Sequence, residues 1–290
     1  MTRSVWRNGR WWETGGQVIL RCFRVEAGSD THGGVTSFTG RVAVVTGGTK
    51  GIGRAVAARF EAAGATVVTL ARTEPAQAVG RFIAADLASP AAIRAAFAAI
   101  ADEFGRVDVL VNNAGGARPG RALDYPEDAA RAAFDLNVLG VLHAAQCMYP
   151  LTPEHGGASI VNIGSVAGTR PSPGTAVYGA AKAALASLTK SLALEWAPRV
   201  RVNCVVPGPV LTESLTAYYG GPEAAALVGQ GLPMGRMAEP ADIAGACLYL
   251  ASDEAGQVSG AELLVHGGGE APRFNRESGA AGRATGAGGK

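Results

Sequence analysis

The sequence lacks long apolar stretches, although 48% of its 290 residues are hydrophobic. No apolar run approaches the roughly 18 residues that a membrane-spanning helix needs, so we expect no membrane contact. The N-terminal segment is basic and has a short apolar piece, but it lacks the apolar core and cleavage site of a signal peptide. We therefore expect no export of the chain.

Cysteine is scarce, and it never occurs as a CxxC pair. The four cysteines are Cys22, Cys147, Cys204 and Cys247. A disulfide framework or a zinc site would need closer spacing or neighbouring histidines, so we expect neither, and no metal. Cys204 and Cys247 lie in apolar segments and are interpreted as small buried side chains. This cysteine usage fits a reducing, cytoplasmic location.

Charge of one sign does not gather anywhere along the chain. The formal net charge is +2, and lysines and arginines are scattered through the sequence. A nucleic-acid surface needs basic residues concentrated on one face, so we expect no nucleic-acid partner.

The two ends of the sequence differ from its middle. Residues 1–37 carry several tryptophans and arginines and end in a turn-rich stretch. They are either a genuine N-terminal extension, disordered or ordered, or upstream sequence translated from a misplaced start, with the native protein beginning near Val35. Residues 38–270 are predicted to form one domain. Residues 271–290 are rich in Gly, Ala and Arg and are predicted to be a disordered tail.

Short apolar runs alternate with helical patterns through this domain. The runs are Val42–Val45, Thr66–Leu70, Arg81–Ala84, Val107–Val111, Ser159–Ile163, Arg201–Val205 and Glu262–Val265. They are rich in β-branched residues, which is typical of parallel strands covered on both faces. Between two of them, Ser89 and Pro90 signal a helix start and Gly105 a helix end. The alternation predicts an α/β fold with a doubly wound, Rossmann-like parallel sheet in a single domain.

A glycine-rich turn joins the first predicted strand to the first predicted helix. Its sequence, TGGTKGIG, contains Gly47, Thr49, Lys50, Gly51, Ile52 and Gly53. Glycines permit a tight turn and close approach of the backbone to phosphates, and the helix start offers free N–H groups to a pyrophosphate. No Gly-Lys-Ser/Thr follows, so the turn is not a Walker loop. It predicts a dinucleotide site.

The end of the second predicted strand bears on which nicotinamide cofactor binds. An acidic residue there would bond the adenosine ribose and repel a 2′-phosphate, but the strand ends in Leu70-Ala71-Arg72. Arg72 and Lys50 can face a 2′-phosphate from two sides, which favours NADP(H). Glu74 is close enough to keep NAD(H) open, and the plain alternative is that both cations are solvated surface charges.

Two further segments follow predicted strands at the same edge of the sheet. Asp86 and Leu87 follow the third strand, where the carboxylate either bonds the adenine amino group or simply flanks a helix. Asn113, Ala114 and Gly115 end the fourth run with small side chains and amides that can pack against the cofactor and tie neighbouring strands together.

A serine, a tyrosine and a lysine form the candidate catalytic group. Ser165 lies just past the fifth strand, and Tyr178 and Lys182 share one face of a predicted helix one turn apart. A free tyrosine has a pKa near 10. The lysine cation favours the phenolate, and Ser165 can donate to a substrate oxygen. The set indicates proton transfer at Tyr178.

The stretch from Phe38 to Gly269 resembles the short-chain dehydrogenase/reductase family. The matching motifs, in the family's order, are TGGTKGIG, NNAG, the Asn137 of DLNVLG, Ser165, YGAAK and PGPVLT. One departure is His266-Gly-Gly, where family members often have Asp-Gly-Gly. The loss of that carboxylate affects the C-terminal turn or a subunit contact.

The resemblance assigns roles to the candidate residues. It makes Tyr178 the general acid/base and Ser165 the donor that orients the carbonyl. Lys182 holds the nicotinamide ribose and lowers the Tyr178 pKa, and Asn137 holds a water in a proton relay. The PGPVLT segment passes beside the nicotinamide with Pro207, Gly208, Val210 and Thr212, whose side chain reaches the cofactor. The resemblance also implies a seven-stranded sheet, a homodimer or homotetramer, and chemistry without a metal.

These expectations converge on an NADP(H)-dependent oxidoreductase that moves a hydride between cofactor and a small carbonyl or secondary alcohol, resembling 3-oxoacyl reductases. Alternatives are an NAD(H)-dependent alcohol dehydrogenase of the same fold and a nucleotide-binding regulatory protein without turnover. Residues 211–237 are rich in glycine and proline and are predicted to form a mobile lid. Their apolar side chains suit an apolar or aromatic substrate and subunit packing equally well.

Overall fold

The structure is a computed structural model that describes residues 5–7, 10–12 and 37–269. The chain divides into two units, residues 1–34 and 35–290. In the first unit, strands β1 (Val5–Arg7) and β2 (Arg10–Trp12) pair in antiparallel fashion. The rest of the predicted N-terminal extension, the predicted tail at 271–290 and Cys22 lie outside the described residues.

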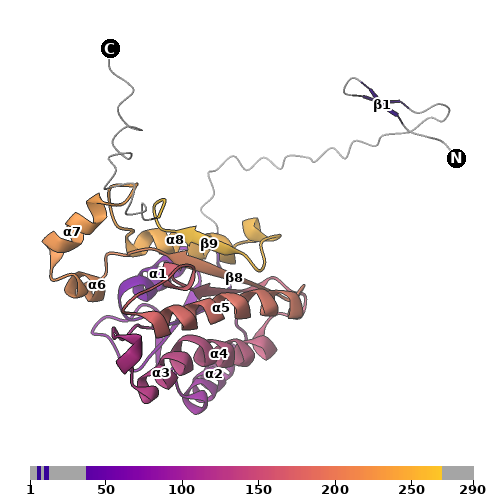
Figure 1. The fold of residues 1–290 in the computed structure, drawn as a ribbon. Coiled ribbons are helices and arrows are strands. Elements are labelled where there is room, and N and C mark those ends of the chain that lie inside the picture. The colour runs from indigo at the N-terminus through magenta and orange to yellow at the C-terminus, as the bar shows by residue number, and fades with distance from the viewer. Residues whose placement is uncertain (1–4, 8–9, 13–36, 270–290) are drawn as a thin grey trace. The chain divides into compact units, whose positions relative to one another are not determined.

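The second unit is built on a seven-stranded parallel sheet (Figure 1). The strands are β3 (Val42–Thr46), β4 (Thr66–Ala71), β5 (Arg81–Ala84), β6 (Val109–Asn112), β7 (Ala158–Ile163), β8 (Val200–Pro207) and β9 (Glu262–Val265). They are arranged β5-β4-β3-β6-β7-β8-β9. From β3 the chain adds β4 and β5 on one side, and it then crosses to add β6 and the later strands on the other side, so the switch in strand order lies between β3 and β6. The predicted doubly wound sheet is confirmed. Ligands bind such sheets at this switch point, beyond the carboxyl ends of the strands.

One strand begins later than its apolar run predicts. Val107 is fully buried, but its amide donates to Leu151 O, and β6 starts only at Val109. Between them, Asp108 accepts the Val42 amide at its carboxylate, at 2.8 Å. A buried apolar side chain therefore does not by itself place a residue in the sheet.

Helices cover both faces of the sheet. They are α1 (Gly51–Ala62), α2 (Pro90–Phe104), α3 (Glu127–Phe134), α4 (Gly140–Met148), α5 (Ala176–Glu195), α6 (Glu213–Tyr218), α7 (Pro222–Gln230) and α8 (Pro240–Ala251). In Figure 1, α1 and α8 lie on one side of the sheet and α2, α4 and α5 on the other. Each layer contributes its own apolar core.

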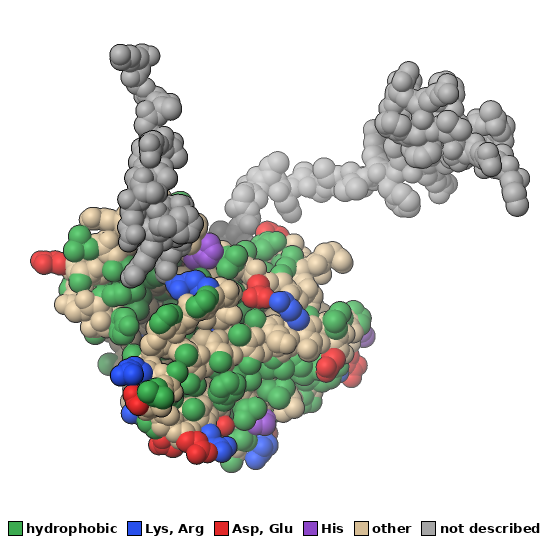
Figure 2. Space-filling model, viewed as in Figure 1, with side chains coloured by type: hydrophobic (Ala, Val, Ile, Leu, Met, Phe, Trp, Pro, Cys, Tyr) green, Lys and Arg blue, Asp and Glu red, His purple; other side chains and the backbone are tan. Residues whose placement is uncertain are grey.

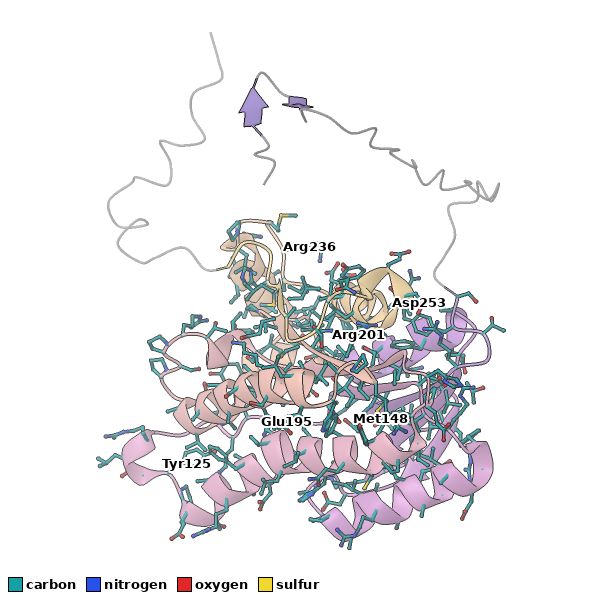
Figure 3. The ribbon with its side chains drawn as sticks, turned by 90° about the vertical axis from the view of Figure 1, so that its right-hand side faces the viewer. Tyr125, Met148, Glu195, Arg201, Arg236 and Asp253 are labelled. Atoms are coloured by element: carbon teal, nitrogen blue, oxygen red, sulfur yellow. The ribbon has the colours of Figure 1, made fainter. Side chains whose placement is uncertain are left out.

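The apolar spacing of the helices explains these two cores. Phe60 of α1 and Ile243 of α8 are fully buried on one side of the sheet. Ile93 of α2 and Met148 of α4 are fully buried on the other, and Figure 3 labels Met148. Burying a side chain of this size contributes about 1.5–3 kcal/mol, which outweighs helix propensity as the reason these segments are helical here.

The start and end of α2 follow the predicted capping signals. The Ser89 side chain accepts the Ala92 amide, Pro90 occupies the first turn, and Gly105 ends the helix with φ of 69°. Glycine adopts this left-handed conformation without strain. The prediction from Ser89 to Gly105 is confirmed.

Helix α5 buries one face against the sheet. Lys182, Leu185, Thr189 and Leu192 are buried at helical spacing. Leu194, only two residues after Leu192, is 85% exposed. Residues two positions apart in an α-helix are separated by about 200° around its axis, so Leu192 and Leu194 cannot share a face.

A half-buried arginine hydrogen-bonds the C-terminal end of α8. The Arg201 guanidinium on β8 donates to Leu250 O at 2.7 Å, to Ser252 O at 2.9 Å and to Val258 O at 3.2 Å. Figure 3 labels Arg201 together with Asp253, which follows Ser252 in that turn. The bonds to Leu250 O and Ser252 O pair carbonyls at the C-terminal end of the helix, and the bond to Val258 O ties the loop that follows.

The predicted lid contains two short helices, α6 and α7, that share a small core. Ala225, Leu232 and Met237 are buried there. At the base of the lid, Val210 pairs with Ala238 in a β-bridge. Residues 211–237 thus form a compact unit with a closed base, although Tyr218, Leu227 and Met234 stay largely exposed.

Candidate active site

The predicted site residues gather at the carboxyl edge of the sheet. They follow β3 (Gly47, Thr49, Lys50, Gly51, Ile52, Gly53), β4 (Arg72), β5 (Asp86, Leu87), β6 (Asn113, Ala114, Gly115) and β7 (Ser165), and end or follow β8 (Pro207, Gly208, Val210, Thr212). Tyr178 and Lys182 come to the same edge on α5, and Asn137 comes on the helix between α3 and α4.

The glycine-rich turn requires glycine at specific positions. Gly47 and Gly51 have φ of 64° and 51°, in the left-handed region. A Cβ on Gly53 would lie 2.1 Å from Gly47 O and 2.4 Å from Asn113 Nδ2. The turn therefore closes on itself more tightly than any other residue at position 53 would allow.

The turn delivers an uncapped helix N-terminus. Lys50 is the extended N-cap residue of α1, its side chain makes no capping bond, and the first turn holds no acidic residue. The N–H groups of this turn and the helix dipole are therefore free to face an anion. This is the donor set that a pyrophosphate needs, so the residues present fit a dinucleotide. Thr212 lies next to the glycine turn: its Cγ2 would be 3.3 Å from a Cβ added to Gly51.

An open cavity adjoins this helix start. Its volume is about 290 Å³, and its lining residues are Gly51, Arg54, Ala55, Ala58, Leu211, Glu213 and Pro240. The glycine turn and the base of the lid therefore border the same open space.

Thr46, the last residue of β3, ties the turn to β6. Its hydroxyl oxygen accepts the amides of Asn113 and Ala114, both at 3.0 Å. The Asn113 side-chain amide in turn donates to Thr46 O and Gly47 O, at 3.0 and 3.1 Å. The prediction that these amides tie adjacent strands is confirmed. Thr46 itself was missed, because a threonine ending a buried strand carries no signal of what it will bond.

Asn137 lies in a widened turn of helix. The segment Asp135–Leu139 is π-helical and joins α3 to α4, and π-helical turns are frequent at functional sites. Asn137 is fully buried there. Its Nδ2 donates to Ala133 O at 2.9 Å and Gly116 O at 3.2 Å, and its Oδ1 accepts the Gly116 amide at 3.3 Å. The Asn137 side chain thus hydrogen-bonds both the N–H and the C=O of Gly116, in the loop that follows β6.

Gly115 separates Asn137 from Lys182. A Cβ on Gly115 would lie 2.6 Å from Asn137 Oδ1 and 3.3 Å from Lys182 Nζ. The missing side chain leaves room between an amide oxygen and an ammonium group, which are two good partners for a water.

Ser165 and Tyr178 are brought together in the fold. The Ser165 side chain lies close enough to Tyr178 to act on the pKa of the phenol as a hydrogen-bonding group, in the lowering direction. Ser165 Oγ also accepts the Ala167 amide at 3.1 Å, which orients the hydroxyl as the cap of a short 3₁₀ turn, Val166–Gly168. The separation of the two residues along the sequence does not give their distance in space, but the two side chains lie close together, as predicted.

The Lys182 side chain approaches Tyr178 from the buried face of α5. Its side chain is 5% exposed, and Nζ donates to Ile163 O at 2.8 Å. Nζ also lies 5.7 Å from the centre of the Tyr178 ring. The lysine is therefore anchored to the end of β7, two residues before Ser165.

Burial shifts both ionisable groups toward their neutral forms. It raises the pKa of Tyr178 above 10.0, although the hydrogen bond from Ser165 acts in the lowering direction. Burial lowers the pKa of Lys182 from 10.5 to about 8, although the nearby Cys204 thiolate would favour the charged lysine. The expected lowering of the Tyr178 pKa by Lys182 is thus not found in the protein alone. Desolvation outweighs it, and a sequence shows no desolvation.

The predicted cofactor-selecting residues lie at the surface. Arg72 follows β4 and Lys50 lies in the glycine turn, and both side chains are exposed. Asp86 is also exposed, and its Oδ1 accepts the Ala88 amide at 3.1 Å. All three stand at the same edge of the sheet as the glycine turn.

The segment after β8 packs against the residue that departs from the family pattern. A Cβ on Gly208 would lie 2.8 Å from His266 Cβ, so glycine is needed for this approach. The His266 Nδ1 atom is buried without a hydrogen-bond partner. Pro207 and Val210 flank Gly208 and are buried.

A buried polar chain behind the site was not predicted. Asn112 and Asn162 end neighbouring strands and hydrogen-bond through their side chains, and Asn162 bonds Thr189 of α5. Asparagines in apolar strands were the available signal, but their partners are distant in sequence.

Two classes of feature are absent from the described residues. No group of three or more His, Cys, Asp and Glu side chains is placed to hold a metal ion within the part of the chain that the structure describes. Among those same residues, no helix is long and apolar enough to cross a membrane. Cys147, Cys204 and Cys247 are free thiols, and Cys204 and Cys247 are buried as expected.

The chain is similar to known oxidoreductases over most of its length. The profile of the enoyl-(acyl carrier protein) reductase family matches residues 47–270. An uncharacterized oxidoreductase of Mycobacterium tuberculosis is 41% identical over 79% of this chain and 91% of its own length. The 3-oxoacyl-[acyl-carrier-protein] reductase of Escherichia coli is 36% identical over 80% of this chain and 98% of its own.

A solved structure shows the same relationship in three dimensions. The RhlG/NADP active-site complex of Pseudomonas aeruginosa superposes with a TM-score of 0.74 at 32% identity, covering 80% of this chain and 97% of that one. The similarity therefore extends over nearly all of the described second unit.

Proposed function

Because this chain belongs to the short-chain dehydrogenase/reductase family, we propose that it is an NADP(H)-dependent ketoreductase. It is an oxidoreductase, and its proposed reaction interconverts a small carbonyl compound and the corresponding secondary alcohol. The observation that carries the proposal is that Ser165 and Lys182 both lie close to Tyr178. The same edge of the sheet carries the glycine turn and the uncapped N-terminus of α1.

In the proposed mechanism, two hydroxyl groups bind the carbonyl oxygen. Ser165 donates one hydrogen bond and stabilises the negative charge that develops on that oxygen. Tyr178 donates the second and gives up its proton as the oxygen becomes an alcohol. The raised pKa of Tyr178 keeps it protonated near neutral pH, which is the form needed to act as an acid in reduction.

Lys182 and Asn137 return the proton to Tyr178. Lys182 lies behind the tyrosine ring with a pKa of about 8, so it can both hold and release a proton near neutral pH. Asn137 Oδ1 faces Lys182 across Gly115, and the space between them suits a water that passes protons toward solvent. In this proposal Asn137 also holds the loop at Gly116 in place.

The glycine turn would hold the pyrophosphate of the dinucleotide at the start of α1, and Lys182 would hold the nicotinamide ribose. The segment Pro207–Thr212 would pass beside the nicotinamide, and Asn113–Gly115 and Asp86 beside the adenosine half. When bound, the nicotinamide donates or accepts the hydride and, in its oxidised form, adds a positive charge.

The proposed preference for NADP(H) depends on two exposed cations. Arg72 and Lys50 stand at the edge where the adenosine ribose would lie, and the end of β4 carries no carboxylate to repel a 2′-phosphate. Exposed guanidinium and ammonium groups bind phosphate strongly. The NADP-bound relative also favours this choice. Glu74 is the residue through which NAD(H) would compete.

The substrate class follows from the relatives and the lid. A relative reduces a 3-oxoacyl-[acyl-carrier-protein], judging by its name, so 3-oxoacyl compounds are the first carbonyls to test. The lid exposes Tyr218, Leu227 and Met234, which suit an apolar substrate chain.

Assembly and location stay predictions. Figure 2 shows a face with few charges over α4 and α5. Leu194 of α5 is 85% exposed, and Leu139, which immediately precedes α4, is 44% exposed. Exposed apolar side chains on neighbouring helices favour the homodimer or homotetramer expected from the sequence. A cytoplasmic location and a domain spanning residues 38–270 are likewise predictions.

A panel of carbonyls and alcohols, offered with NADPH, NADH, NADP⁺ and NAD⁺, tests the proposal. We expect NADPH oxidation with at least one ketone, at a rate at least about 100-fold lower with Tyr178→Phe, while both proteins bind NADPH. If wild type and variant bind cofactor but are equally inert across the panel, the chain is a nucleotide-binding protein without turnover and the proposal fails.

A further inference from the structure

Three buried polar side chains link two strands to the catalytic helix. Asn112 Nδ2 donates to Asn162 Oδ1 at 2.9 Å, and Asn162 Nδ2 donates to Thr189 Oγ1 at 2.9 Å. The Thr189 hydroxyl then donates to Leu185 O at 2.8 Å. Asn162 and Thr189 are fully buried and Asn112 is 2% exposed. The chain therefore runs from β6 through β7 to α5 without reaching solvent.

This polar chain stands among apolar residues that could pack without it. Leu185 and Leu192 flank Thr189 on the buried face of α5. Replacing buried hydrogen-bonded groups by apolar ones is often neutral for stability, so stability alone does not account for such a chain. Hydrogen bonds differ from apolar contacts in being directional, which gives them a role in fixing one position of the helix.

The polar chain is connected to the proposed site through β7 and α5. Asn162 immediately precedes Ile163, whose carbonyl oxygen anchors Lys182 at 2.8 Å. Thr189 lies on the same helix face as Lys182, two turns further on. A helix that rotated or slid along β7 would break the bond between Thr189 and Asn162 and carry Tyr178 away from Ser165.

We infer that Thr189 is a positioning residue: its bond to Asn162 fixes the rotation and height of α5 on β7, and thereby sets Tyr178 against Ser165. This inference rests on the proposed function for its kinetic consequence, but its structural part does not. A displacement of about 1 Å at a reacting group can cost on the order of 100-fold in rate. A lost bond at Thr189 moves the helix by less, so we expect about a tenfold loss of kcat.

The test compares three variants of the full chain. Thr189→Val removes the hydroxyl at nearly constant volume, Thr189→Ser keeps it, and Ser159→Ala is the matched control. Ser159 is also a fully buried hydroxyl on β7, and it donates to Leu250 O of α8 at 3.2 Å, at the opposite end of the strand. Melting temperature, NADPH dissociation constant, kcat, KM and the pH profile of kcat are measured for each.

We expect Thr189→Val to lose about tenfold in kcat and to change its pH profile, with the NADPH dissociation constant within about twofold of wild type. Thr189→Ser should keep kcat, and Ser159→Ala should keep both kcat and profile even where its melting temperature falls. Equal kcat in Thr189→Val and wild type would overturn the inference, and so would an equal loss of kcat in Ser159→Ala.

A second readout needs no turnover. Absorbance titration of wild type minus Tyr178→Phe isolates the ionisation of Tyr178 in the protein alone. In Thr189→Val, loosened packing should admit water and move this ionisation to lower pH, whereas in Thr189→Ser and Ser159→Ala it should not move. An inert wild type would defeat the proposed function and leave this test intact. If Thr189→Val does not fold while Thr189→Ser does, the hydroxyl serves folding as a whole and the inference is overturned.

Discussion

Lys182 Nζ lies 2.8 Å from Ile163 O, so the proposed proton carrier of α5 is tied to the strand that delivers Ser165. This bond is made in a place that is unfavourable for charge, because the side chain is only 5% exposed. The lysine therefore serves the site at a cost to the stability of the fold.

That cost should be visible as a dependence of stability on pH. The pKa of Lys182 is about 8 in the folded protein and returns to 10.5 on unfolding. Between these values the unfolded chain binds more protons, so the free energy of unfolding rises with pH. Below pH 8 the full cost applies, about 3 kcal/mol. From about pH 8 the buried Cys204 and Cys247 act in the opposite direction, because burial raises the pKa of both thiols above 9.0, for Cys204 to about 11.

We therefore expect Lys182 to contribute a gain of about 1 kcal/mol in the free energy of urea unfolding between pH 8 and pH 9, measured as the difference between wild type and Lys182→Met. Lys182→Met should remove this gain and should be more stable than wild type at pH 7 by about 2–3 kcal/mol. Lys190→Met, at an exposed lysine of the same helix, should keep it. An unchanged pH slope in Lys182→Met would show that the lysine stays charged in the fold.

The glycine turn makes a prediction about cofactor binding. Gly53→Ala would place a Cβ 2.1 Å from Gly47 O, so the turn must open. We expect NADPH to bind at least about tenfold more weakly, because the N–H groups of the turn lose their alignment. Gly245→Ala is the control, since nothing lies within 4 Å of a Cβ there. It should leave NADPH binding unchanged and raise stability by about 0.5–1 kcal/mol.

The proposed cofactor preference depends on Arg72. Arg72→Ala should weaken NADPH binding by about tenfold to 100-fold, because a charge-assisted hydrogen bond of about 1.5–3 kcal/mol is lost. NADH binding should change little. Arg59→Ala removes an exposed cation from the last turn of α1 and serves as the control for net charge. Fluorescence titration with both nucleotides decides: a preference that survives in Arg72→Ala means that Arg72 does not read the 2′-phosphate.

Arg201 should stabilise the fold without affecting the site. Arg201→Met removes a charged donor from the carbonyls of Leu250, Ser252 and Val258, each of which keeps one other donor. We expect a loss of about 2–4 kcal/mol in unfolding free energy, with NADPH binding intact. Arg131→Met, in an exposed pair with Glu127, should cost less than about 0.5 kcal/mol. Similar losses in the two variants would contradict the capping role of Arg201.

The elements that sequence predicts best are those fixed by local chemistry. The glycine turn, the caps of α2 and the helical pairing of Tyr178 with Lys182 depend on neighbours within a few residues. Thr46 could not be predicted, because its partner Asn113 lies 67 positions away. The same holds for Asn162 and Thr189, whose bond forms only once α5 has packed on β7.

The predicted direction of the Tyr178 pKa shift is wrong for a different reason. The lysine one turn away predicts a lowered pKa, but Lys182 is buried and Tyr178 half-buried, and this removal from water raises the pKa of Tyr178. Electrostatic reasoning from sequence counts charges and has no measure of the water removed around them.

The central claim is direct hydride transfer at a site where Tyr178 supplies the proton. It is tested by reducing a carbonyl found in the panel with each of the two NADPH forms that carry one deuterium at C4, and weighing the product. We predict one deuterium in the product from one form and none from the other, and a rate about 100-fold to 10,000-fold lower with Tyr178→Phe. Label from neither form, or a Tyr178→Phe variant as fast as wild type, would contradict the account.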